Sequence, residues 1–466
     1  MTLEPGVVLP TARAVLTPDY GSAGEAKLRA FVEHLTGGKV TRMERQIRWR
    51  PAWFADVERD GECLQLHLRG DREGDVAIFP DLKREADVME VLGQQGIAVP
   101  RIHGYCTDPP CIVMDTLPGS RNLAEAASDA ERSAIAREYM AQVAAMHRLP
   151  VAPFAVKGLH VPQGPEAIAL VGLEAYLPLY RRTKSRPEPM LEFVIGWLRR
   201  NVPRHRTKAA FIQFDSGQFL FKDGRVTGLY DFEFSMIGDP MVDLATMRMR
   251  DSIEPLGDDM RALFRHYETC AGLAVDDAVV DYHTLMFATL GTMQFTGTVG
   301  KPTPGDPHAV YLEFDLALRQ VMLRAMSTMM DVTLTPEAPP AEQLGDNAAL
   351  IAKLADTVAR IDTGSPLDAA RKDSAAQLIE WLSRTDALGP EVRRRDIAAV
   401  SALLGRPFDR WPAAEAALET FVLSAGPERD VDLLRLFGAI EGRQLQLYGP
   451  TRIGHSALHV HLPPIR

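Results

Sequence analysis

The first 115 residues change their hydrophobic period in an order that constrains the fold. Three short runs have the composition of strands, and they span residues 40–45, 53–57 and 63–68. Over residues 80–96 apolar side chains recur at spacings of three and four, which predicts a helix. Two further strands are predicted within 100–114. The order β-β-β-α-β-β predicts a small sheet accompanied by one helix.

The remainder of the chain is mostly helical, with one return to strands. Helical spacing covers 123–147, 166–179, 188–201 and 240–332, and short strands with a tight turn occupy 210–232. A proline-rich stretch then precedes a region rich in Ala and Leu. The chain therefore divides into a lead-in with a short helix, a sheet lobe, a mostly helical lobe, a linker and a small helical domain, with predicted bounds of 1–36, 37–115, 116–332, 333–346 and 347–466.

Composition and charge exclude several classes of protein. The 466 residues are 46% hydrophobic and 24% charged, which is typical of globular domains and excludes a disordered or fibrous chain. A net charge of −10 argues against a broad nucleic-acid surface. Four cysteines are too few and too scattered for a disulfide framework, so reduced thiols are expected. Because no apolar run approaches the roughly 18 residues of a membrane span and the N-terminus lacks a signal-peptide core, we expect a cytoplasmic protein with no nucleic-acid or membrane partner.

The segment 211–245 carries the chemistry. Asp215 follows one predicted strand, Gln218 comes three residues later, and a hairpin returns the chain to Asp231. Hairpin geometry is expected to bring these three side chains to the same end of a small sheet. One carboxylate can then take the proton of an acceptor hydroxyl, while an amide oxygen and a second carboxylate hold Mg²⁺ on nucleotide phosphates. The alternative is that both aspartates are ordinary turn and cap residues.

The same segment resembles the aminoglycoside-phosphotransferase-like branch of the protein-kinase-like fold. It is most similar to the subgroup related to the kinase domains fused to acyl-CoA dehydrogenases, which reads Q-G-D-T-G-P-G-N-F, then D-W-E, then G-D-P and D-L-A. This chain has Q-F-D-S-G at 213–217, D-F-E at 231–233, G-D-P at 238–240 and D-L-A at 243–245. The resemblance covers roughly residues 30–330. It implies an α+β, two-lobed protein-kinase-like fold with a small β-sheet lobe and a larger, mostly helical lobe, followed here by an all-α C-terminal domain.

The catalytic loop departs from the family pattern. The family places Asn five residues after the catalytic Asp, whereas Gln218 lies three residues after Asp215, and Phe214 replaces the family glycine. A gapped alignment makes Asp215 the catalytic base. An alignment without gaps puts Gln213 at that position and leaves no carboxylate base there. The block Q-x-D-[ST]-G favours the gapped alignment.

The sheet lobe offers candidate nucleotide ligands. The stretch 45–53 stands where the family has a glycine-rich phosphate loop, but it has no glycine and three arginines, of which Arg48 is a candidate phosphate ligand; a hairpin with solvated arginines is the alternative. The resemblance makes Arg69 the cation for the nucleotide phosphates and Glu85 its partner, which predicts an Arg69–Glu85 ion pair. It also places adenine against the backbone near Met114.

Five further residues have other expected roles. His147 is expected to cap carbonyls at a helix C-terminus. Asp239 and Asp243 are expected to fix the catalytic loop and cap the following helix. Arg248 and Arg250 either reach an anionic acceptor or lie on a solvated helix face.

Two functions are the main alternatives at this point, and altered chemistry on the same fold, with the nucleotide bound in a different orientation, is a third possibility. The first is an ATP- and Mg²⁺-dependent small-molecule phosphotransferase acting on a hydroxyl, with Asp215 as base, and Gln218 and Asp231 as metal ligands. The resemblance points to a hydroxyacyl-CoA or related hydroxy acid as acceptor, with an aminoglycoside as a lesser alternative. The second is a catalytically degenerate, pseudokinase-like binding or scaffold protein, favoured by the shortened loop and the missing glycines. The C-terminal helical domain would then dock a protein partner.

Overall fold

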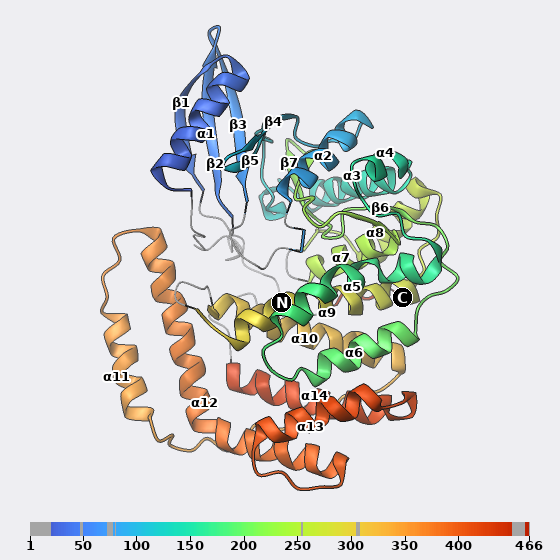
Figure 1. Ribbon diagram of the computed structural model, residues 1–466, viewed down its shortest axis with the longest axis vertical. Helices are drawn as coiled ribbons and strands as arrows, with labels where there is room; N and C mark the ends of the chain where they lie inside the picture. The colour runs from blue at the N-terminus through green and yellow to red at the C-terminus, as the bar shows by residue number, and fades with distance from the viewer. Residues whose placement is uncertain are drawn as a thin grey trace. The chain divides into compact units, whose positions relative to one another are not determined.

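The computed structural model describes residues 20–46, 50–71, 78–79, 81–252, 255–303, 308–449 and 462–465 (Figure 1). The strands are β1 (Lys39–Arg45), β2 (Ala52–Arg59), β3 (Glu62–Gly70), β4 (Ile102–Thr107), β5 (Pro110–Asp115), β6 (Ala210–Ile212), β7 (Phe219–Lys222), β8 (Arg225–Leu229) and β9 (Met236–Gly238). The first helices are α1 (Gly21–Thr36), α2 (Leu82–Gln94), α3 (Asp129–His147), α4 (Ala152–Val156), α5 (Gly164–Thr183), α6 (Pro189–Arg200), α7 (Met241–Asp251) and α8 (Met260–Ala271). The later helices are α9 (Asp277–Gly300), α10 (His308–Met330), α11 (Ala348–Ala359), α12 (Pro366–Leu404), α13 (Trp411–Ser424) and α14 (Asp430–Tyr448), and two 3₁₀ turns are η2 (Leu123–Glu125) and η3 (Pro427–Arg429).

The described residues form two compact units. The first unit comprises those within 1–171, 204–277 and 463–466, and it contains every described strand. The second unit comprises those within 172–203 and 278–462 and is helical. These units follow spatial contacts, whereas the domain boundaries given above come from sequence pattern and stay predictions.

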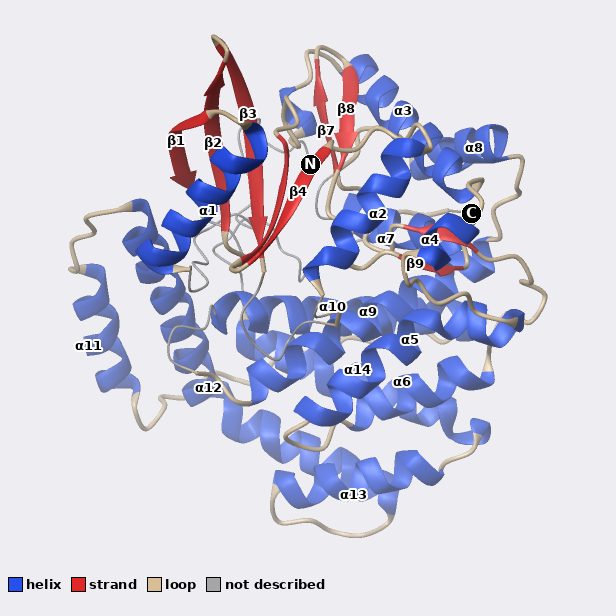
Figure 2. Ribbon diagram, turned by 45° about the horizontal axis from the view of Figure 1, so that its top comes forward, coloured by secondary structure: helices blue, strands red, loops and turns tan. Residues whose placement is uncertain are grey.

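The sheet of the first unit has the strand order β1-β2-β3-β5-β4, with every neighbouring pair antiparallel. Figure 2 shows α1 against this sheet and the strands in red. Leu28 and Val32 of α1 pack against the sheet, and neither has exposed surface. The sheet side chains of this cluster include those of Val57, Leu66 and Leu68, which are also fully buried. Alternate residues of a strand point to the same face, so Leu66 and Leu68 lie on one face of the sheet. The predicted order β-β-β-α-β-β along the chain is confirmed. Within the sheet, β3 lies beside β5.

Helix α2 covers the predicted helical region and carries a functional side chain on its buried face. Its first turn is capped by Asp81, whose carboxylate accepts a hydrogen bond from the Lys83 backbone N–H at 2.9 Å. The buried positions include Glu85, Val88 and Leu92, which recur at helical spacing. Glu85 is only 2% exposed, so its carboxylate needs a partner.

The short strands of the larger lobe form two pairs, β6 with β9 and β7 with β8. The β7–β8 hairpin aligns Phe219 with Leu229, and the Tyr230 N–H donates to the Gln218 carbonyl at 3.1 Å. As a result Gln218 and Asp231 flank the open end of the hairpin. The three-residue strand β9 was absent from the prediction because its pairing with β6 is non-local.

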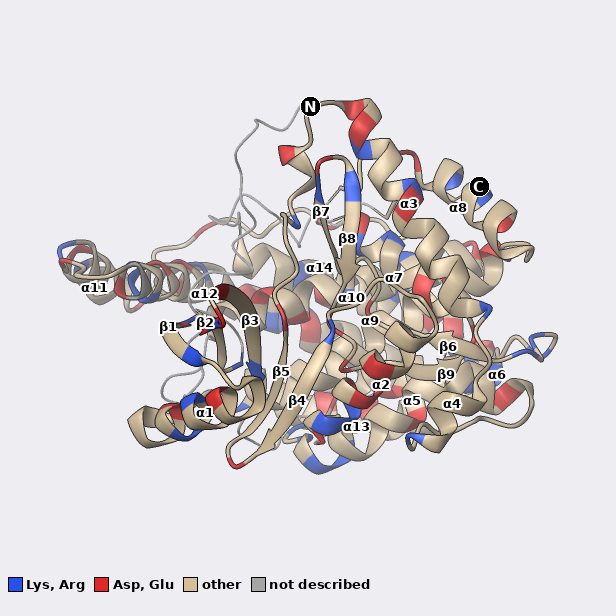
Figure 3. Ribbon diagram, turned by 90° about the horizontal axis from the view of Figure 1, so that it is seen from above, with Lys and Arg blue, Asp and Glu red and all other residues tan. Residues whose placement is uncertain are grey.

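Unit two is held together in part by a buried charge cluster. Arg319 donates to Asp315 at 2.9 Å and to Glu188 at 2.9 Å, and it lies 3.4 Å from Glu441. Along α11 and α12, by contrast, acidic and basic side chains are interspersed (Figure 3), and pairs such as Lys353–Asp356 are exposed. Such exposed pairs contribute little to stability. Over the described part of the chain, no helix combines the length and apolarity that crossing a membrane requires.

Candidate active site

A cavity of about 380 Å³ opens in the first unit, beside the strands β2, β3 and β5. This volume lies in the range of small-molecule sites. It is lined by Gln46, Arg50, Ala52, Phe54, His67, Arg69, Glu85, Met89, Pro100, Met114, Asp115, Thr116, Leu117, Gly119, Ser120, Arg121, Leu220, Tyr230 and Asp231. Three candidates from the sequence, Arg69, Glu85 and Asp231, therefore share one cavity with Met114.

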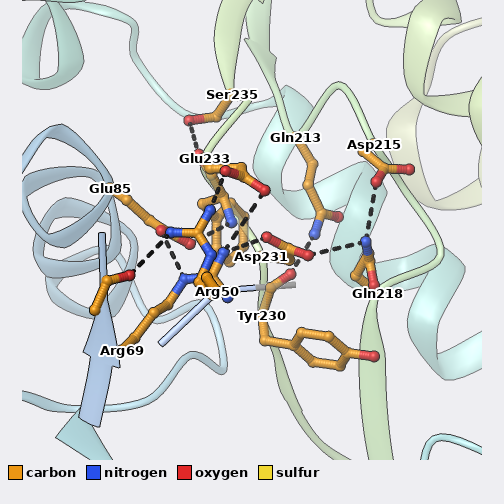
Figure 4. A network of polar contacts seen from close by, with 12 residues as sticks. Arg50, Arg69, Glu85, Gln213, Asp215, Gln218, Tyr230, Asp231, Glu233 and Ser235 are labelled. Carbon is orange, nitrogen blue, oxygen red and sulfur yellow. Dashed lines mark hydrogen bonds and ion pairs between the residues drawn. The ribbon is translucent and has the colours of Figure 1, made fainter. Parts of the chain in front are cut away.

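Arg69 joins the sheet to the carboxylates of this cavity. Its Nε donates to Glu85 Oε2 at 2.8 Å, and its Nη2 donates to Asp231 Oδ1 at 2.5 Å (Figure 4). The predicted Arg69–Glu85 ion pair is thereby confirmed. Glu85 also accepts from the Phe232 backbone N–H at 3.1 Å, so the same carboxylate orders the segment that follows β8. The guanidinium is held in place from two sides.

Burial and charge act against each other on this pair. Burial alone would lower the pKa of Arg69, but Glu85, Asp231 and Glu233 outweigh it and the pKa is raised. Burial raises the pKa of Glu85, and Arg69 and Arg50 offset part of that effect. The arginine therefore stays charged, and it supplies a fixed cation at the cavity wall.

Asp231 and Asp215 are linked through Gln218. The Gln218 Nε2 donates to Asp215 Oδ2 at 3.0 Å and to Asp231 Oδ2 at 3.2 Å (Figure 4). Two carboxylates and an amide are the oxygen-bearing groups that suit Mg²⁺ when phosphates and water complete the coordination. Among the described residues no group of three or more His, Cys, Asp or Glu side chains forms a ready metal site. The donor set here fits a metal that arrives with a nucleotide.

Asp215 has a cationic partner, Arg250, for which the sequence analysis left two roles open. Arg250 donates from Nη2 to Asp215 Oδ1 at 2.7 Å and from Nε to the Ser216 carbonyl at 2.8 Å. Burial raises the pKa of Asp215, Arg250 lowers it and Asp231 raises it, and the net pKa is raised. Arg248 donates to the Pro463 carbonyl at 2.7 Å. The alternative of a solvated helix face is therefore wrong for both arginines.

The Asp243 carboxylate anchors the loop that carries Asp215. Asp243 accepts from the backbone N–H groups of Gln213 and Phe214 at 2.9 and 2.8 Å. The side-chain amide of Gln213 donates to the Tyr230 carbonyl at 2.8 Å, and Gln213 is fully buried. Because Gln213 is used inside the fold while Asp215 faces Gln218 (Figure 4), the geometry favours the gapped alignment.

The remaining structural expectations are settled by contacts. Asp239 pairs with Arg206 through two bonds of 2.9 Å and accepts from the Met241 N–H at 3.0 Å, so it caps α7 as expected. The expected loop-fixing role of Asp243 is likewise confirmed. His147 differs: its ring nitrogens contact the Tyr267 hydroxyl at 2.7 Å and Asp243 at 3.0 Å, instead of helix carbonyls.

Two candidates and two missed residues complete the site. Arg48 lies outside the described residues. Met114 is a buried residue of β5 that lines the cavity. Arg50 and Glu233, which sequence reasoning did not pair, form an ion pair beside Arg69 (Figure 4). The one available signal was the position of Arg50 in the arginine-rich stretch before β2.

Comparison with known proteins agrees with this geometry. Residues 69–277 match the phosphotransferase enzyme family. Acyl-CoA dehydrogenase family member 11 from Homo sapiens is 28% identical over 176 residues, which cover 35% of this chain and 22% of that protein. The protein of the same name from Pongo abelii is 27% identical over the same shares. The chain thus spans about a fifth of the length of these relatives.

Among solved structures, a candidate aminoglycoside phosphotransferase from Ralstonia eutropha superposes with a TM-score of 0.52 at 17% identity. The match covers 66% of this chain and 98% of that one, and it shows the fold. The Arg69–Glu85 pair and the Asp215–Gln218–Asp231 link both lie within residues 69–277. Residues 69–277 therefore match the phosphotransferase enzyme family, and the chain has a two-lobed, protein-kinase-like fold.

Proposed function

We propose that the protein transfers the γ-phosphoryl group of ATP to a hydroxyl of a small-molecule acceptor. One observation carries this proposal: a continuous polar chain runs Glu85–Arg69–Asp231–Gln218–Asp215 (Figure 4), and its first three residues line the cavity. Its order places a cation for phosphates, a carboxylate for metal and a second carboxylate for the acceptor side by side. Positioning and charge stabilisation of this kind supply most of the catalysis in phosphoryl transfer.

Each end of the chain has its own task. At one end Arg69, held by Glu85, contacts the nucleotide phosphates, and the backbone at Met114 receives the adenine. At the other end Asp215 accepts the acceptor's hydroxyl proton. As that proton leaves, the acceptor oxygen bonds to the γ-phosphorus and the bond from that phosphorus to the β–γ bridging oxygen breaks, releasing ADP.

Mg²⁺ would be held by the Asp231 carboxylate and the carbonyl oxygen of Gln218, and it would neutralise charge on the phosphates. This leaves the Asp215 carboxylate to act as the base. Gln218 can present that oxygen by rotating its amide by half a turn, because amide nitrogen and oxygen occupy equivalent positions. Gln is one methylene longer than the family's Asn, so it recovers reach across the shortened loop.

For the acceptor we propose a hydroxyacyl-CoA or a related hydroxy acid. The support is the partial similarity to a protein named for acyl-CoA dehydrogenases, together with the charge beside the base. Arg250 lies 2.7 Å from Asp215, so an anionic acceptor meets a cation next to the reacting hydroxyl. An aminoglycoside is a polycation and gains no attraction from Arg250 at this point.

The test is phosphoryl transfer from labelled ATP to 3-hydroxyacyl-CoAs, free hydroxy acids and aminoglycosides. We expect label on a hydroxyacyl compound. Asp215→Asn is expected to bind MgATP normally while transfer falls by at least about 100-fold, since a general base contributes 10²–10⁴-fold. A fully active Asp215→Asn would contradict the proposal, and label on aminoglycosides alone would replace the acceptor class.

A specific contact favours a second candidate, a nucleotide-binding protein without transfer activity. The Gln218 amide N–H group bonds both carboxylates, and Arg250 occupies Asp215 from the other side. If these contacts persist with MgATP bound, Asp215 cannot take a proton. Tight MgATP binding with no transfer to any acceptor would favour this candidate, with the C-terminal helical domain as the proposed site for a protein partner.

A further inference from the structure

Arg50 lies where side-chain chemistry can replace a glycine-rich phosphate loop. It precedes β2, lines the same cavity as Arg69, and is only 5% exposed. The stretch 45–53 contains no glycine, and Pro51 next to Arg50 has no backbone N–H to offer. In this turn a guanidinium is the group best suited to bind phosphate oxygens in two-pronged fashion.

The partner of Arg50 is a carboxylate from the segment that follows β8. Arg50 Nη2 pairs with Glu233 Oε2, and Arg50 Nη1 donates to the Gly70 carbonyl at 3.4 Å (Figure 4). Glu233 Oε1 lies 3.9 Å from Arg69 Nη2, so this one carboxylate lies near both guanidinium groups. Glu233 itself does not line the cavity, but its carboxylate pairs with the guanidinium groups of two arginines that do.

The carboxylates around Arg50 and Arg69 differ in exposure and in how they are held. They belong to Glu85, Asp231 and Glu233. Glu85 is 2% exposed and is held by both Arg69 and the Phe232 N–H. Asp231 is needed for the metal. Glu233 is 17% exposed, so its carboxylate is more accessible than that of Glu85. Three negative charges already exceed two positive ones, so withdrawal of one carboxylate would reduce the repulsion that nucleotide phosphates meet.

The backbone of Glu233 is fixed, so its side chain can move alone. Arg84 donates to the carbonyls of Glu233, at 3.2 Å, and of Ser235. Burial lowers the pKa of Arg84 to about 10, which still leaves it charged at neutral pH. A rotation of the Glu233 side chain therefore releases Arg50 without moving the segment that holds Asp231.

We propose that Arg50 is a phosphate-binding residue of the nucleotide site and that Glu233 is an internal phosphate mimic, exchanged for the phosphates when nucleotide binds. This inference rests on the proposed function, since it assumes that a nucleotide occupies the cavity. It assigns to one arginine and one glutamate the discrimination between phosphorylated and unphosphorylated adenosine. Arg50 acts on binding, while Asp215 acts on transfer.

The experiment is calorimetric titration of the full chain with ATP, ADP, AMP and adenosine. Arg50→Ala is expected to lose roughly 10- to 100-fold in ATP and ADP affinity, because a charge-assisted bond is removed, with little change for adenosine. Arg50→Lys keeps part of the affinity. Glu233→Gln is expected to bind ATP several-fold more tightly, and this gain should vanish in the Arg50→Ala/Glu233→Gln double variant.

Arg42→Ala is the matched control, because Arg42 is an exposed arginine of the neighbouring strand β1 and it does not line the cavity. It should bind all four ligands as the wild type does. If the wild type binds no nucleotide, the proposed function fails. If it binds ATP but Arg50→Ala binds equally well, or Glu233→Gln binds more weakly, the inference about Arg50 and Glu233 is overturned while the proposed function stands. Because Glu233→Gln is nearly isosteric, it decides the matter even if Arg50→Ala does not fold.

Discussion

Arg250, near the end of α7, contacts Asp215 with its Nη2 atom 2.7 Å from Oδ1, and the same side chain donates to the Ser216 carbonyl. The contact joins a helix to the loop that carries the proposed base. Arg250 packs so closely over Gly217 that a Cβ there would lie 2.3 Å from its Cδ. This arginine therefore sets both the position and the charge of Asp215.

The pH dependence of transfer should report that charge. A base works only when deprotonated, so activity falls as pH drops through the pKa of Asp215, which burial already raises and Arg250 lowers. Arg250→Ala should raise this pKa further and move the acidic limb of the kcat/KM profile to higher pH. Arg250→Lys should keep most of the wild-type profile. The control is Arg225→Ala, an exposed arginine on β8; an acidic limb that stays in place in Arg250→Ala would refute the assignment.

Asp243 should be a stability determinant. Its carboxylate accepts from two backbone N–H groups and contacts His147, all within 3.0 Å and with no exposure. An Asn side chain at this position has only one acceptor oxygen. Its NH₂ group would face one of the two backbone N–H donors, which would lose its hydrogen bond. Asp243→Asn should therefore lower the free energy of unfolding by about 1–3 kcal/mol in chemical denaturation. Asp223→Asn, in an exposed turn with φ of 51°, should be neutral because Asn tolerates that conformation.

The helical unit should lose stability as pH rises from about 4.5 to about 7. Burial raises the pKa of Glu313 to about 7, while a hydrogen bond from Tyr448 lowers it in part. A carboxyl with a raised folded-state pKa contributes most below its unfolded pKa, and this contribution is lost as pH rises through about 7. Glu313→Gln should remove about 3 kcal/mol of the fall in stability between pH 4.5 and 8.

Urea denaturation at pH 5 and pH 8 measures this difference. Part of the fall in the free energy of unfolding with pH should remain, because burial also raises the pKa of Glu441 to about 7. Exposed Glu342→Gln serves as the control and should keep the wild-type slope. An unchanged slope in Glu313→Gln would mean that this carboxyl is not responsible.

Much of the fold could be predicted because its signals are local. The order of strands and helix along the chain before residue 115 follows from changes of hydrophobic period, and the Arg69–Glu85 pair follows from the resemblance of two short motifs to the family pattern. The loop bearing Asp215 was harder. Phe214 has a φ of 74°, a left-handed conformation that suits the glycine of the family pattern, and it is fully buried. Its burial compensates for backbone strain that no local propensity rule would accept.

The parts that could not be predicted are contacts between distant segments. Arg50 and Glu233 are 183 residues apart, and Arg250 reaches Asp215 across 35 residues. A charged residue in a sequence does not reveal which opposite charge the fold will bring to it. For the same reason His147 was placed on a helix end correctly, but its partners Tyr267 and Asp243 were not foreseen.

The central claim is that the Asp231 carboxylate takes part in binding a nucleotide together with Mg²⁺. Calorimetric titration of ATP and of GTP, each with and without Mg²⁺, on the wild type and on Asp231→Asn tests it most directly. The account predicts Mg²⁺-dependent binding of a nucleotide by the wild type, weakened in Asp231→Asn. Failure of both nucleotides to bind at millimolar concentration, or equal Mg²⁺-dependent binding by the two proteins, would contradict it.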